Sequence, residues 1–564
     1  MVVVGAAFTG VMGDAGVSQW RVVGAELVRA ETIGDLLRGA VEAAPEVCAL
    51  VEGVADPAAR RRWTYGELSG EVRRVAWGLL GRFEVGERVA VWANNIPEWT
   101  ILQLAAAVAG MPLVTVDPAL RRDEVRHVLR TSGAVGVFLV RRYRDNPMAE
   151  TVDQLRGDLP ALREVVYFDQ WRDFAGTPTP LPEVRPGDTA QIQFTSGTTG
   201  VPKGVVLHHS GLVNSARLSY TRTLRLRRAD PVLNAMPLFH TAGSVLATLS
   251  AIAAGSTHVL MPYFDPGLFL RLVEQERSVL VAGVPTMLRA LLDHPALPGT
   301  DLSSLRCALS GGAVVPPELV ARVEEAFGVP LAVIYAQTEA SPAITMTDPF
   351  TDSAADRAGT IGRPVAGVEV AVVSGGRVVP VGEPGELCTR GHHVMTGYLD
   401  QPEQTALAVD ADGWLHTGDL AAMDGRGYCR IAGRLKEMII RGGENLFPRE
   451  IEDVLARHPG VAEVVVFGVP DEHWGEQPAA VVRARPGTTL TEDELVAYGR
   501  AHLARQKVPR LWRFVDHIPT TGSGKVSRSR LRDLVLAEAP VPPDQNSSDQ
   551  NSSHSGGGRG EQAQ

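Results

Sequence analysis

The alternation of apolar and polar residues predicts an α/β protein in which strands and helices follow one another along most of the chain. Short apolar runs predict buried strands, and apolar residues at every third or fourth position predict amphipathic helices between them. Alternation of this kind is typical of a doubly wound parallel sheet. Up to residue 140 the predicted strands are 88–92, 113–116 and 134–140, and the predicted helices begin near residue 34 and then cover 72–80, 98–109 and 122–129.

The alternation of predicted strands and helices resumes beyond residue 210 and implies a second sheet of the same type. Its predicted strands are 232–236, 257–261, 279–282, 306–310 and 331–335. Its predicted helices are 211–219, 242–253, 267–276, 286–292 and 317–327.

The pattern changes after about Gly359 to short alternating runs with Gly and Pro every few residues, which predicts a small antiparallel β-barrel. The apolar and polar pattern over residues 438–539 predicts a compact α+β domain. Its predicted helices are 448–457 and 492–503, and its predicted strands are 461–469, 479–484 and 511–515. The segment 540–564 repeats Asp-Gln-Asn-Ser-Ser and is too poor in apolar residues to fold, so we expect a disordered tail.

The predicted fold is therefore a large N-terminal domain, residues 25–433, made of two doubly wound α/β sheets and a small β-barrel, followed by a small C-terminal α+β domain. Residues 1–24 lack the positive start of a secretory signal, and we expect them to form a flexible extension. The chain of 564 residues exceeds what one domain usually holds, which agrees with this division.

Composition and charge exclude several classes of partner. A net charge of −10 argues against nucleic acid or an anionic membrane surface, since both need a concentrated basic face. The uncharged stretches 99–116 and 231–264 are interrupted by Gly, Pro and polar residues, so no integral membrane segment is expected. The four cysteines are widely separated and form neither a disulfide framework nor a zinc site, which favours the reducing cytoplasm.

The loop after the apolar run 190–194 has the composition of a phosphate-binding loop. It carries hydroxyl and lysine side chains together with glycines that let backbone N–H groups turn inward. It lacks the spacing of the common NTPase loop, and Pro202 prevents an immediate helix. Apolar runs on both sides are expected to hold its two ends, although the same composition also occurs in flexible linkers. The residues concerned are Thr195, Ser196, Gly197, Thr198, Thr199, Gly200 and Lys203.

Four further groups of residues suit a bound ligand, and the first three follow predicted strands, at the strand ends where ligands collect in parallel sheets. Phe239 and His240 follow one strand, although a histidine at such a place can equally bond a backbone carbonyl. The pair Gly311 and Gly312 follows another and lets a flat ligand approach bare backbone. The segment 335–339 combines a tyrosine ring with a threonine and a glutamate. Asp419 is expected on a turn, where it could accept two hydrogen bonds from vicinal hydroxyls.

In this order, these motifs resemble those of the adenylate-forming superfamily, which includes acyl-CoA synthetases, luciferases and the adenylation domains of peptide synthetases. The resemblance covers roughly residues 25–535 and is nearest to fatty and medium-chain acyl-CoA synthetases. It departs from the family pattern at Ala336, where the family has Gly, and at Glu437, where many relatives have Asp.

The resemblance implies a nucleotide site and a set of catalytic residues. The nucleotide-binding residues it implies are Thr195, Ser196, Gly197, Thr198, Thr199, Gly200, Lys203, Gly311, Gly312, Ala313, Tyr335, Ala336, Gln337, Thr338, Asp419, Ile431, Arg434 and Lys525. The catalytic residues are Lys525, Thr195, His240 and Glu339, and Glu339 and Thr195 would hold Mg²⁺.

The resemblance also implies an acyl pocket, a CoA channel and a mobile C-terminal domain. The acyl pocket would be lined by Phe239, His240, Thr241, Val284, Met287 and Gly311. The CoA channel would be formed by Gly442, Gly443 and Glu444. Residues 434–437 would act as the hinge, with Lys436 as the residue whose backbone rotates.

The implied activity is ATP-dependent activation of a carboxylic acid through an acyl-adenylate, followed by thioester formation with CoA. Two alternatives remain open from the sequence: transfer of the activated group to another acceptor such as a separate carrier protein, and a nucleotide-binding scaffold without catalysis. The intact Lys203, Glu339, Asp419, Arg434 and Lys525 argue against the scaffold.

Overall fold

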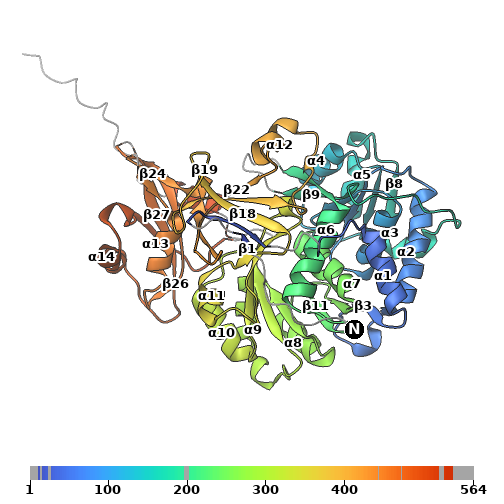
Figure 1. Ribbon diagram of the computed structural model, residues 1–564, viewed down its shortest axis with the longest axis horizontal. Helices are drawn as coiled ribbons and strands as arrows, with labels where there is room; N and C mark the ends of the chain where they lie inside the picture. The colour runs from blue at the N-terminus through green and yellow to red at the C-terminus, as the bar shows by residue number, and fades with distance from the viewer. Residues whose placement is uncertain are drawn as a thin grey trace, which may run out of the picture. The chain divides into compact units, whose positions relative to one another are not determined.

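The computed structural model divides the chain into two compact units, one ending at Glu437 and the other beginning at Met438 (Figure 1). Each unit is described below by itself. The residues that the structure describes are 11–12, 16–22, 27–195, 202–442, 444–471, 473–519, 526 and 528–537.

The first sheet of the larger unit is mostly parallel and carries helices on both faces, as predicted. Val89 and Val91 of β5 pack in one core with helices α1 to α3, and Ala90 and Trp92 pack in another with α4 and α5. Because alternate residues of a strand face opposite sides, helices must cover both faces. The strand order is β21 (Gly397–Tyr398), β10 (Lys203–His208), β9 (Thr189–Thr195), β6 (Leu113–Val116), β5 (Val89–Trp92), β7 (Gly136–Leu139) and β8 (Glu164–Tyr167).

The helices around this sheet begin where local sequence favours a helix start. Thr32 and Thr64 cap α1 and α2, and each forms a reciprocal capping box with an acidic residue, Asp35 or Glu67. The helices are α1 (Ile33–Ala43), α2 (Tyr65–Leu80), α3 (Pro97–Val108), α4 (Arg122–Ser132), α5 (Met148–Leu155) and α6 (His209–Ala216).

The second sheet consists of two segments that meet side by side, where the backbone N–H of Val279 donates to the carbonyl of Pro231 at 2.9 Å. One segment has the order β11 (Pro231–Asn234), β12 (Thr257–Leu260), β3 (Cys48–Glu52) and β4 (Arg62–Thr64). The other has the order β13 (Leu280–Gly283), β14 (Cys307–Gly311), β15 (Leu331–Ala336), β16 (Ala343–Met346) and β17 (Arg363–Pro364). Its helices are α7 (Ser250–Ala254), α8 (Pro266–Gln275), α9 (Pro285–Leu292) and α10 (Pro317–Phe327).

Two helical segments differ from the α-helices that the sequence predicts. Residues Arg217–Thr223 and Ala242–Leu249 are π-helical, and the second continues as α7. Thr248 donates its hydroxyl to the carbonyl of Gly243 at 2.9 Å, five residues back, which suits the wider helix. Hydrophobic periodicity does not distinguish the two helix types, and π-helical segments often lie at functional sites.

The region beyond Gly359 forms antiparallel strands, as predicted, but among the described residues the first and last strands of this sheet do not pair, so it is an open sheet and not the closed barrel that the sequence predicts. Its order is β1 (Val11–Met12), β2 (Gln19–Val22), β18 (Val368–Ser374), β20 (Gly385–Gly391), β22 (Leu415–Met423) and β23 (Cys429–Arg434), and β19 (Arg377–Val378) pairs with β18. The short helix α11 (Ala354–Gly359) precedes β18 in the sequence, and α12 (Pro402–Ala408) lies between β20 and β22.

The N-terminal segment contributes to this sheet, contrary to the flexible extension expected over residues 1–24. Within β2, Trp20 pairs with Val370 of β18. A Cβ atom at Gly427 would lie 2.4 Å from the Trp20 ring, so the indole packs directly on that glycine. A boundary at residue 25 therefore leaves a sheet strand out of the large domain.

The smaller unit is an α+β domain built on a long antiparallel hairpin. Its sheet has the order β25 (Glu444–Leu446), β24 (Ile439–Arg441), β27 (Gly475–Ala484) and β26 (Val461–Asp471), with β28 (Leu511–Phe514) pairing with β27. Its helices are α13 (Pro448–Leu455), α14 (Glu492–His502) and α15 (Arg528–Ala537).

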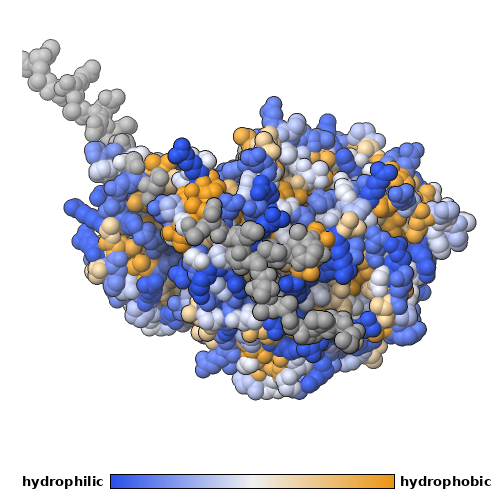
Figure 2. Space-filling model, in the orientation of Figure 1, coloured by the Kyte–Doolittle hydropathy of each residue, from blue (hydrophilic) through white to orange (hydrophobic). Residues whose placement is uncertain are grey.

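The surface carries no continuous apolar patch on the face shown in Figure 2, where hydrophilic residues surround small groups of hydrophobic ones. Among the helices of the described residues, none is long and apolar enough to span a bilayer.

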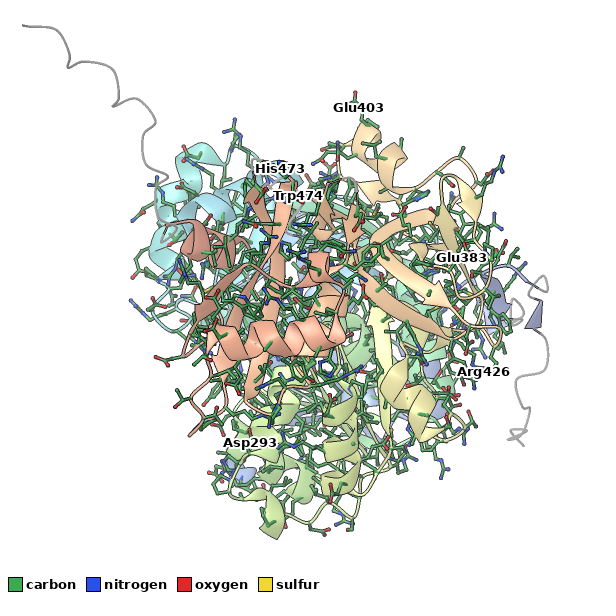
Figure 3. All side chains as sticks on the ribbon, turned by 90° about the vertical axis from the view of Figure 1, so that its left-hand side faces the viewer. Asp293, Glu383, Glu403, Arg426, His473 and Trp474 are labelled. Carbon is green, nitrogen blue, oxygen red and sulfur yellow. The ribbon has the colours of Figure 1, made fainter. Side chains whose placement is uncertain are left out.

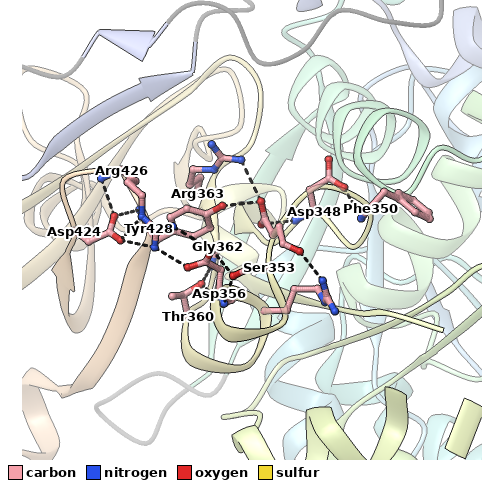
Figure 4. Close-up of polar contacts among 12 residues, drawn as sticks. Asp348, Phe350, Ser353, Asp356, Thr360, Gly362, Arg363, Asp424, Arg426 and Tyr428 are labelled. Carbon is pink, nitrogen blue, oxygen red and sulfur yellow. Dashed lines mark hydrogen bonds and ion pairs between the residues drawn. The ribbon is translucent and has the colours of Figure 1, made fainter. Parts of the chain in front are cut away.

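A network of charged and polar side chains fastens the loop after β16 to the turn between β22 and β23 (Figure 4). The Asp352 side chain is 2% exposed and accepts hydrogen bonds from the Tyr428 hydroxyl at 2.6 Å and from Arg363 at 3.2 Å. The guanidinium groups of Arg363 and Arg426 lie 4.8 and 4.7 Å from the centroid of the Tyr428 ring. Arg426 in turn forms an ion pair with Asp356 at 2.6 Å.

We predict that Asp352→Ala lowers the free energy of unfolding of the larger unit by about 3 kcal/mol, because the substitution leaves Arg363 and Tyr428 without their shared acceptor. Urea denaturation followed by tryptophan fluorescence measures this. The matched control is Asp293→Ala, which removes an exposed ion pair with Arg322 and should cost about 0.5 kcal/mol or less. Equal losses in the two variants would contradict the structural role of the network.

Candidate active site

The predicted phosphate loop lies at the tip of a β-hairpin. Thr195, the last residue of β9, pairs directly with Lys203, the first residue of β10. His127 of α4 contacts the carbonyl of Pro202 through Nε2 at 3.1 Å. The ends of the loop are thus held as the flanking apolar runs predict. Ser196, Gly197, Thr198, Thr199 and Gly200 lie outside the described residues.

The Lys203 ammonium group points toward the segment 398–404, which contains Tyr398 and Gln404. Its Nζ donates to Oε1 of Gln404 at 2.7 Å and lies 4.9 Å from the centroid of the Tyr398 ring. Desolvation and, after it, the positive charge of Lys203 lower the pKa of Lys436. A like charge of this kind disfavours the charged form of its neighbour.

Glu339 lies in the short 3₁₀ turn after β15 and contacts the same segment as Lys203. The Tyr398 hydroxyl donates to Oε1 of Glu339 at 3.1 Å, and the N–H of Met395 donates to the Glu339 carbonyl at 2.8 Å. Burial and then the Glu339 carboxylate raise the pKa of Tyr398 above its usual value. Tyr398 thus contacts both Lys203 and Glu339, and the sequence analysis did not identify it.

Asp419 collects donors from two segments, the end of β15 and the end of β23. Its Oδ2 accepts from the Tyr335 hydroxyl at 2.6 Å and from Gln337 Nε2 at 3.0 Å. Its Oδ1 forms an ion pair with Arg434 Nε at 2.8 Å. The Asp419 side chain is 6% exposed and that of Arg434 is 59% exposed.

The prediction that Asp419 lies on a turn is wrong, because it lies within β22 and pairs with Arg434 of β23. Ile431, two residues after the start of β23, is half-buried and pairs with Ala421. Burial and then the Asp419 carboxylate raise the pKa of Tyr335 well above its usual value, so the phenol stays protonated and continues to donate.

A second polar group supports the backbone next to Asp419. Glu386 accepts from the N–H of Gly418 at 3.0 Å and contacts His416 Nδ1 at 2.8 Å. The Glu386, Cys388 and His416 side chains each place a possible metal ligand within 4.8 Å of the others. Burial, followed by Glu386 and Asp410, raises the pKa of the Cys388 thiol to about 12. Through these hydrogen bonds Glu386 supports the strand backbone at Gly418, next to Asp419.

Gly311, the last residue of β14, approaches its neighbour too closely for any side chain, whereas Gly312 has space beside it but a positive φ that favours glycine. A Cβ atom at Gly311 would lie 2.5 Å from the carbonyl oxygen of Ile334. Gly312 has a φ of +75°, and a Cβ atom there would lie 3.5 Å from Val284. Gly312 and Val284 of the predicted site therefore lie side by side. Met287, one turn into α9, is half-buried, and Ala313 is exposed.

Phe239 and His240 lie in the loop between β11 and the second π-helix, with their ring centroids 4.6 Å apart. Asn95, which follows β5, donates to the carbonyls of Met236 and Met261 and accepts from the N–H of Leu238 at 2.9 Å. Thr115 of β6 donates to the carbonyl of Phe239 at 3.0 Å. Asn95 therefore holds this loop against the first sheet, a role that no motif indicated. Thr241 is buried where the π-helix begins.

The smaller unit carries the residues predicted to form a CoA channel. Gly442 has a φ of +59°, and its Cβ atom would lie 2.7 Å from the Trp474 ring. Its N–H donates to the Trp474 carbonyl at 2.8 Å, and Glu444 begins the neighbouring strand and is exposed. Figure 3 shows Trp474 beside His473, whose ring centroid lies 4.6 Å away. Gly443 and Lys525 lie outside the described residues.

The structure brings together five of the predicted nucleotide residues of the larger unit in two groups of contacts. Tyr335, Gln337 and Arg434 meet at Asp419, and Gln193 Nε2 joins Thr338 to His240 through contacts of 3.2 and 3.4 Å. Lys436 lies in the turn Leu435–Glu437, at the end of this unit.

Comparisons with known proteins give the family. The family model described as AMP-binding enzyme matches residues 37–399, and the AMP-binding enzyme C-terminal domain matches residues 450–525.

Curated relatives cover nearly the whole chain. One is a methyl-dioxo-octahydro-indenyl-propanoyl:CoA ligase of Mycobacterium tuberculosis, 40% identical over 490 residues, which are 84% of this chain and 94% of the relative. Another is the mitochondrial medium-chain acyl-CoA ligase ACSF2 of Rattus norvegicus, 34% identical over 546 residues, which are 90% of this chain and 88% of the relative.

Among solved structures, the anthranilate CoA ligase AuaEII in complex with anthranoyl-AMP superposes with a TM-score of 0.82 at 26% identity, covering 91% of this chain and 99% of that one. Both the motifs and these matches extend over the two units. The chain therefore belongs to the family of AMP-binding enzymes, the adenylate-forming enzymes that its sequence motifs predict.

Proposed function

We propose that this protein is an AMP-forming acid:CoA ligase, which activates a carboxylic acid with ATP and transfers the acyl group to CoA. The observation that carries the proposal is the cluster at Asp419, where a buried carboxylate is held by Tyr335, Gln337 and Arg434. Relatives named as CoA ligases at 34 and 40% identity support CoA as the acceptor.

In this proposal the Asp419 carboxylate accepts hydrogen bonds from the vicinal hydroxyls of the ATP ribose, and the exposed part of Arg434 reaches the ribose and phosphate oxygens. Bare backbone at Gly311 and Gly312 faces the adenine together with the Tyr335 ring. The hairpin loop from Thr195 to Lys203 receives the phosphates.

The first step joins two anions. The acid is ionised near neutral pH, since its pKa is about 4, so it needs no general base. One carboxylate oxygen attacks the α-phosphorus of ATP, the bond from that phosphorus to the bridging oxygen breaks, and pyrophosphate leaves with the electron pair. Lys203 and Lys525 would offset the charge that develops, and His240 would bind the acid's carboxylate beside Phe239.

A magnesium ion is the metal that suits the oxygen ligands offered here. Glu339 and the Thr195 hydroxyl are hard donors of the kind that Mg²⁺ prefers, and Tyr398 fixes one oxygen of the Glu339 carboxylate. When bound, Mg²⁺ supplies positive charge to the phosphate oxygens.

The second step needs another surface at the same site. The CoA thiol attacks the acyl carbon of the adenylate, AMP leaves, and the thiol proton passes to solvent. We propose that residues 438–539 turn about Lys436 between the two steps, withdrawing Lys525 and presenting Gly442, Gly443 and Glu444 to the pantetheine arm. We also place the enzyme in the cytoplasm, because its four cysteines are all free.

The experiment that tests the function incubates the protein with ATP, Mg²⁺, CoA and a panel of medium-chain, aromatic and polycyclic acids, and separates the products by HPLC. An acyl-CoA product from at least one acid is expected. Accumulation of acyl-AMP without acyl-CoA would indicate another acceptor, such as a carrier protein. The absence of both products with every acid would contradict catalysis.

We predict that Glu339→Gln raises the Mg²⁺ concentration for half-maximal activity about 10-fold or more, because an amide oxygen is a weaker ligand for a hard cation than a carboxylate. Titration at fixed total ATP measures it, and calorimetric titration of Mg²⁺ into the ATP-bound protein gives a second readout. The control is Glu383→Gln, a change at a loop residue between β19 and β20, which should leave the requirement unchanged. An unchanged requirement in both variants would exclude Glu339 as the ligand.

We predict that Lys525→Ala slows acyl-adenylate formation by about 100-fold or more while thioester formation from supplied acyl-adenylate stays largely intact, because the lysine offsets charge only in the first step. Single-turnover assays of the two half-reactions measure this. The reverse pattern is expected of Lys436→Pro, which restricts the backbone rotation of the hinge. Equal loss in both half-reactions for Lys525→Ala would refute its assignment.

A further inference from the structure

Gln193 is a buried polar side chain at the centre of the proposed site, and no motif includes it. It lies on β9, two residues before Thr195, and is 1% exposed. A buried amide needs partners for its oxygen and for both of its N–H groups. In Gln193 all three of these groups have a neighbour.

The contacts of Gln193 link three elements of the larger unit. Its Nε2 lies 3.4 Å from His240 Nδ1 and 3.2 Å from the Thr338 hydroxyl. Its Oε1 accepts from Nε2 of Gln191 at 3.3 Å. The distance to His240 is long for a hydrogen bond, as is common at catalytic groups before substrate binds.

The Ser244 hydroxyl lies at the other end of this row of hydrogen bonds, which runs through Gln191 to Gln193. The Ser244 hydroxyl donates to the carbonyl of His240 at 3.1 Å, so its lone pair is what faces Nε2 of Gln191 at 3.4 Å. Reversing Gln193 alone would set its Nε2 against that of Gln191. In the structure, Gln193 Nε2 is the group that faces His240 and donates to it.

The tautomer of His240 follows from this donor. An imidazole nitrogen that accepts a hydrogen bond carries no proton, so the neutral ring holds its proton on Nε2. His240 then offers an N–H donor at Nε2, on the side of the ring away from Gln193. A donor is the group that an ionised carboxylate requires.

We propose that Gln193 is a positioning residue that holds His240 in the Nε2–H tautomer and so makes it a donor to the carboxylate of the acid. The inference rests on the proposed function, in which His240 binds that carboxylate. The same amide also holds Thr338, which precedes Glu339, so one buried side chain aligns the acid-binding and phosphate-binding parts of the site.

Isotope-edited NMR tests the tautomer without any assay of activity. Long-range ¹H–¹⁵N spectra of protein labelled at its 14 histidines distinguish the two protonated nitrogens, and His240→Asn identifies the signal of His240. The expected result is a proton on Nε2 in the unaltered protein and a proton on Nδ1 in Gln193→Glu, whose carboxylate must accept. A proton on Nδ1 in the unaltered protein would overturn the proposal.

Kinetics test the consequence of the tautomer. Gln193→Leu should raise the KM for the acid about 10-fold, because the donor to a charged group is no longer held in place, and should leave the KM for ATP within about 2-fold. The matched control is Gln103→Leu, another buried glutamine, whose amide donates to the Ser244 carbonyl at 3.1 Å and not to His240.

The two experiments separate this inference from the proposed function. An acid KM that rises equally in both glutamine variants would assign Gln193 to packing alone. Absence of acyl-CoA formation by the unaltered protein would instead contradict the function and leave the NMR result to decide the tautomer.

Discussion

The larger unit depends on compensation of one buried negative charge, that of Asp419. A carboxylate taken out of water is costly unless hydrogen bonds and an opposite charge replace its hydration. Tyr335 and Gln337 supply hydrogen bonds from the end of β15, and Arg434 supplies the opposite charge from β23. Because these donors belong to two different sheets, the carboxylate is satisfied only when both sheets have formed and met. The surface that we propose to bind ribose is thus a product of the assembled fold.

The same reasoning applies to the rest of the site, which must bring anions together in a protein whose net charge is −10. Positive groups are therefore placed locally, as with Lys203, whose charge contributes after desolvation to lowering the pKa of Lys436. The neutral residues Tyr398 and Gln193 hold charged or reacting groups in position without adding charge of their own. Buried neutral hydrogen bonds orient the groups of the site, and a few cations attract the anions that it binds.

Much of this could be predicted from the sequence, because hydrophobic periodicity and turn residues are local properties. They located β5 to β7 of the first sheet, β11 to β15 of the second and the loop that β9 and β10 hold, but not β3, β8 or β16. Asn95, Gln193 and Tyr398 escaped prediction because their partners are distant in the chain and single polar residues within apolar runs give no pattern. The strand at Trp20 escaped because its apolar partner is the bare backbone at Gly427, and Asp419 reads as a turn residue until its pairing with Arg434 is known.

The central claim is that the site joins an acid to the α-phosphorus of ATP and releases pyrophosphate before any thiol takes part. The most direct measurement is exchange of radiolabelled pyrophosphate into ATP, with Mg²⁺ and a substrate acid present and CoA absent. The account predicts exchange that requires the acid and is lost in Asp419→Ala. Exchange that occurs without any acid, or only when CoA is added, would contradict it.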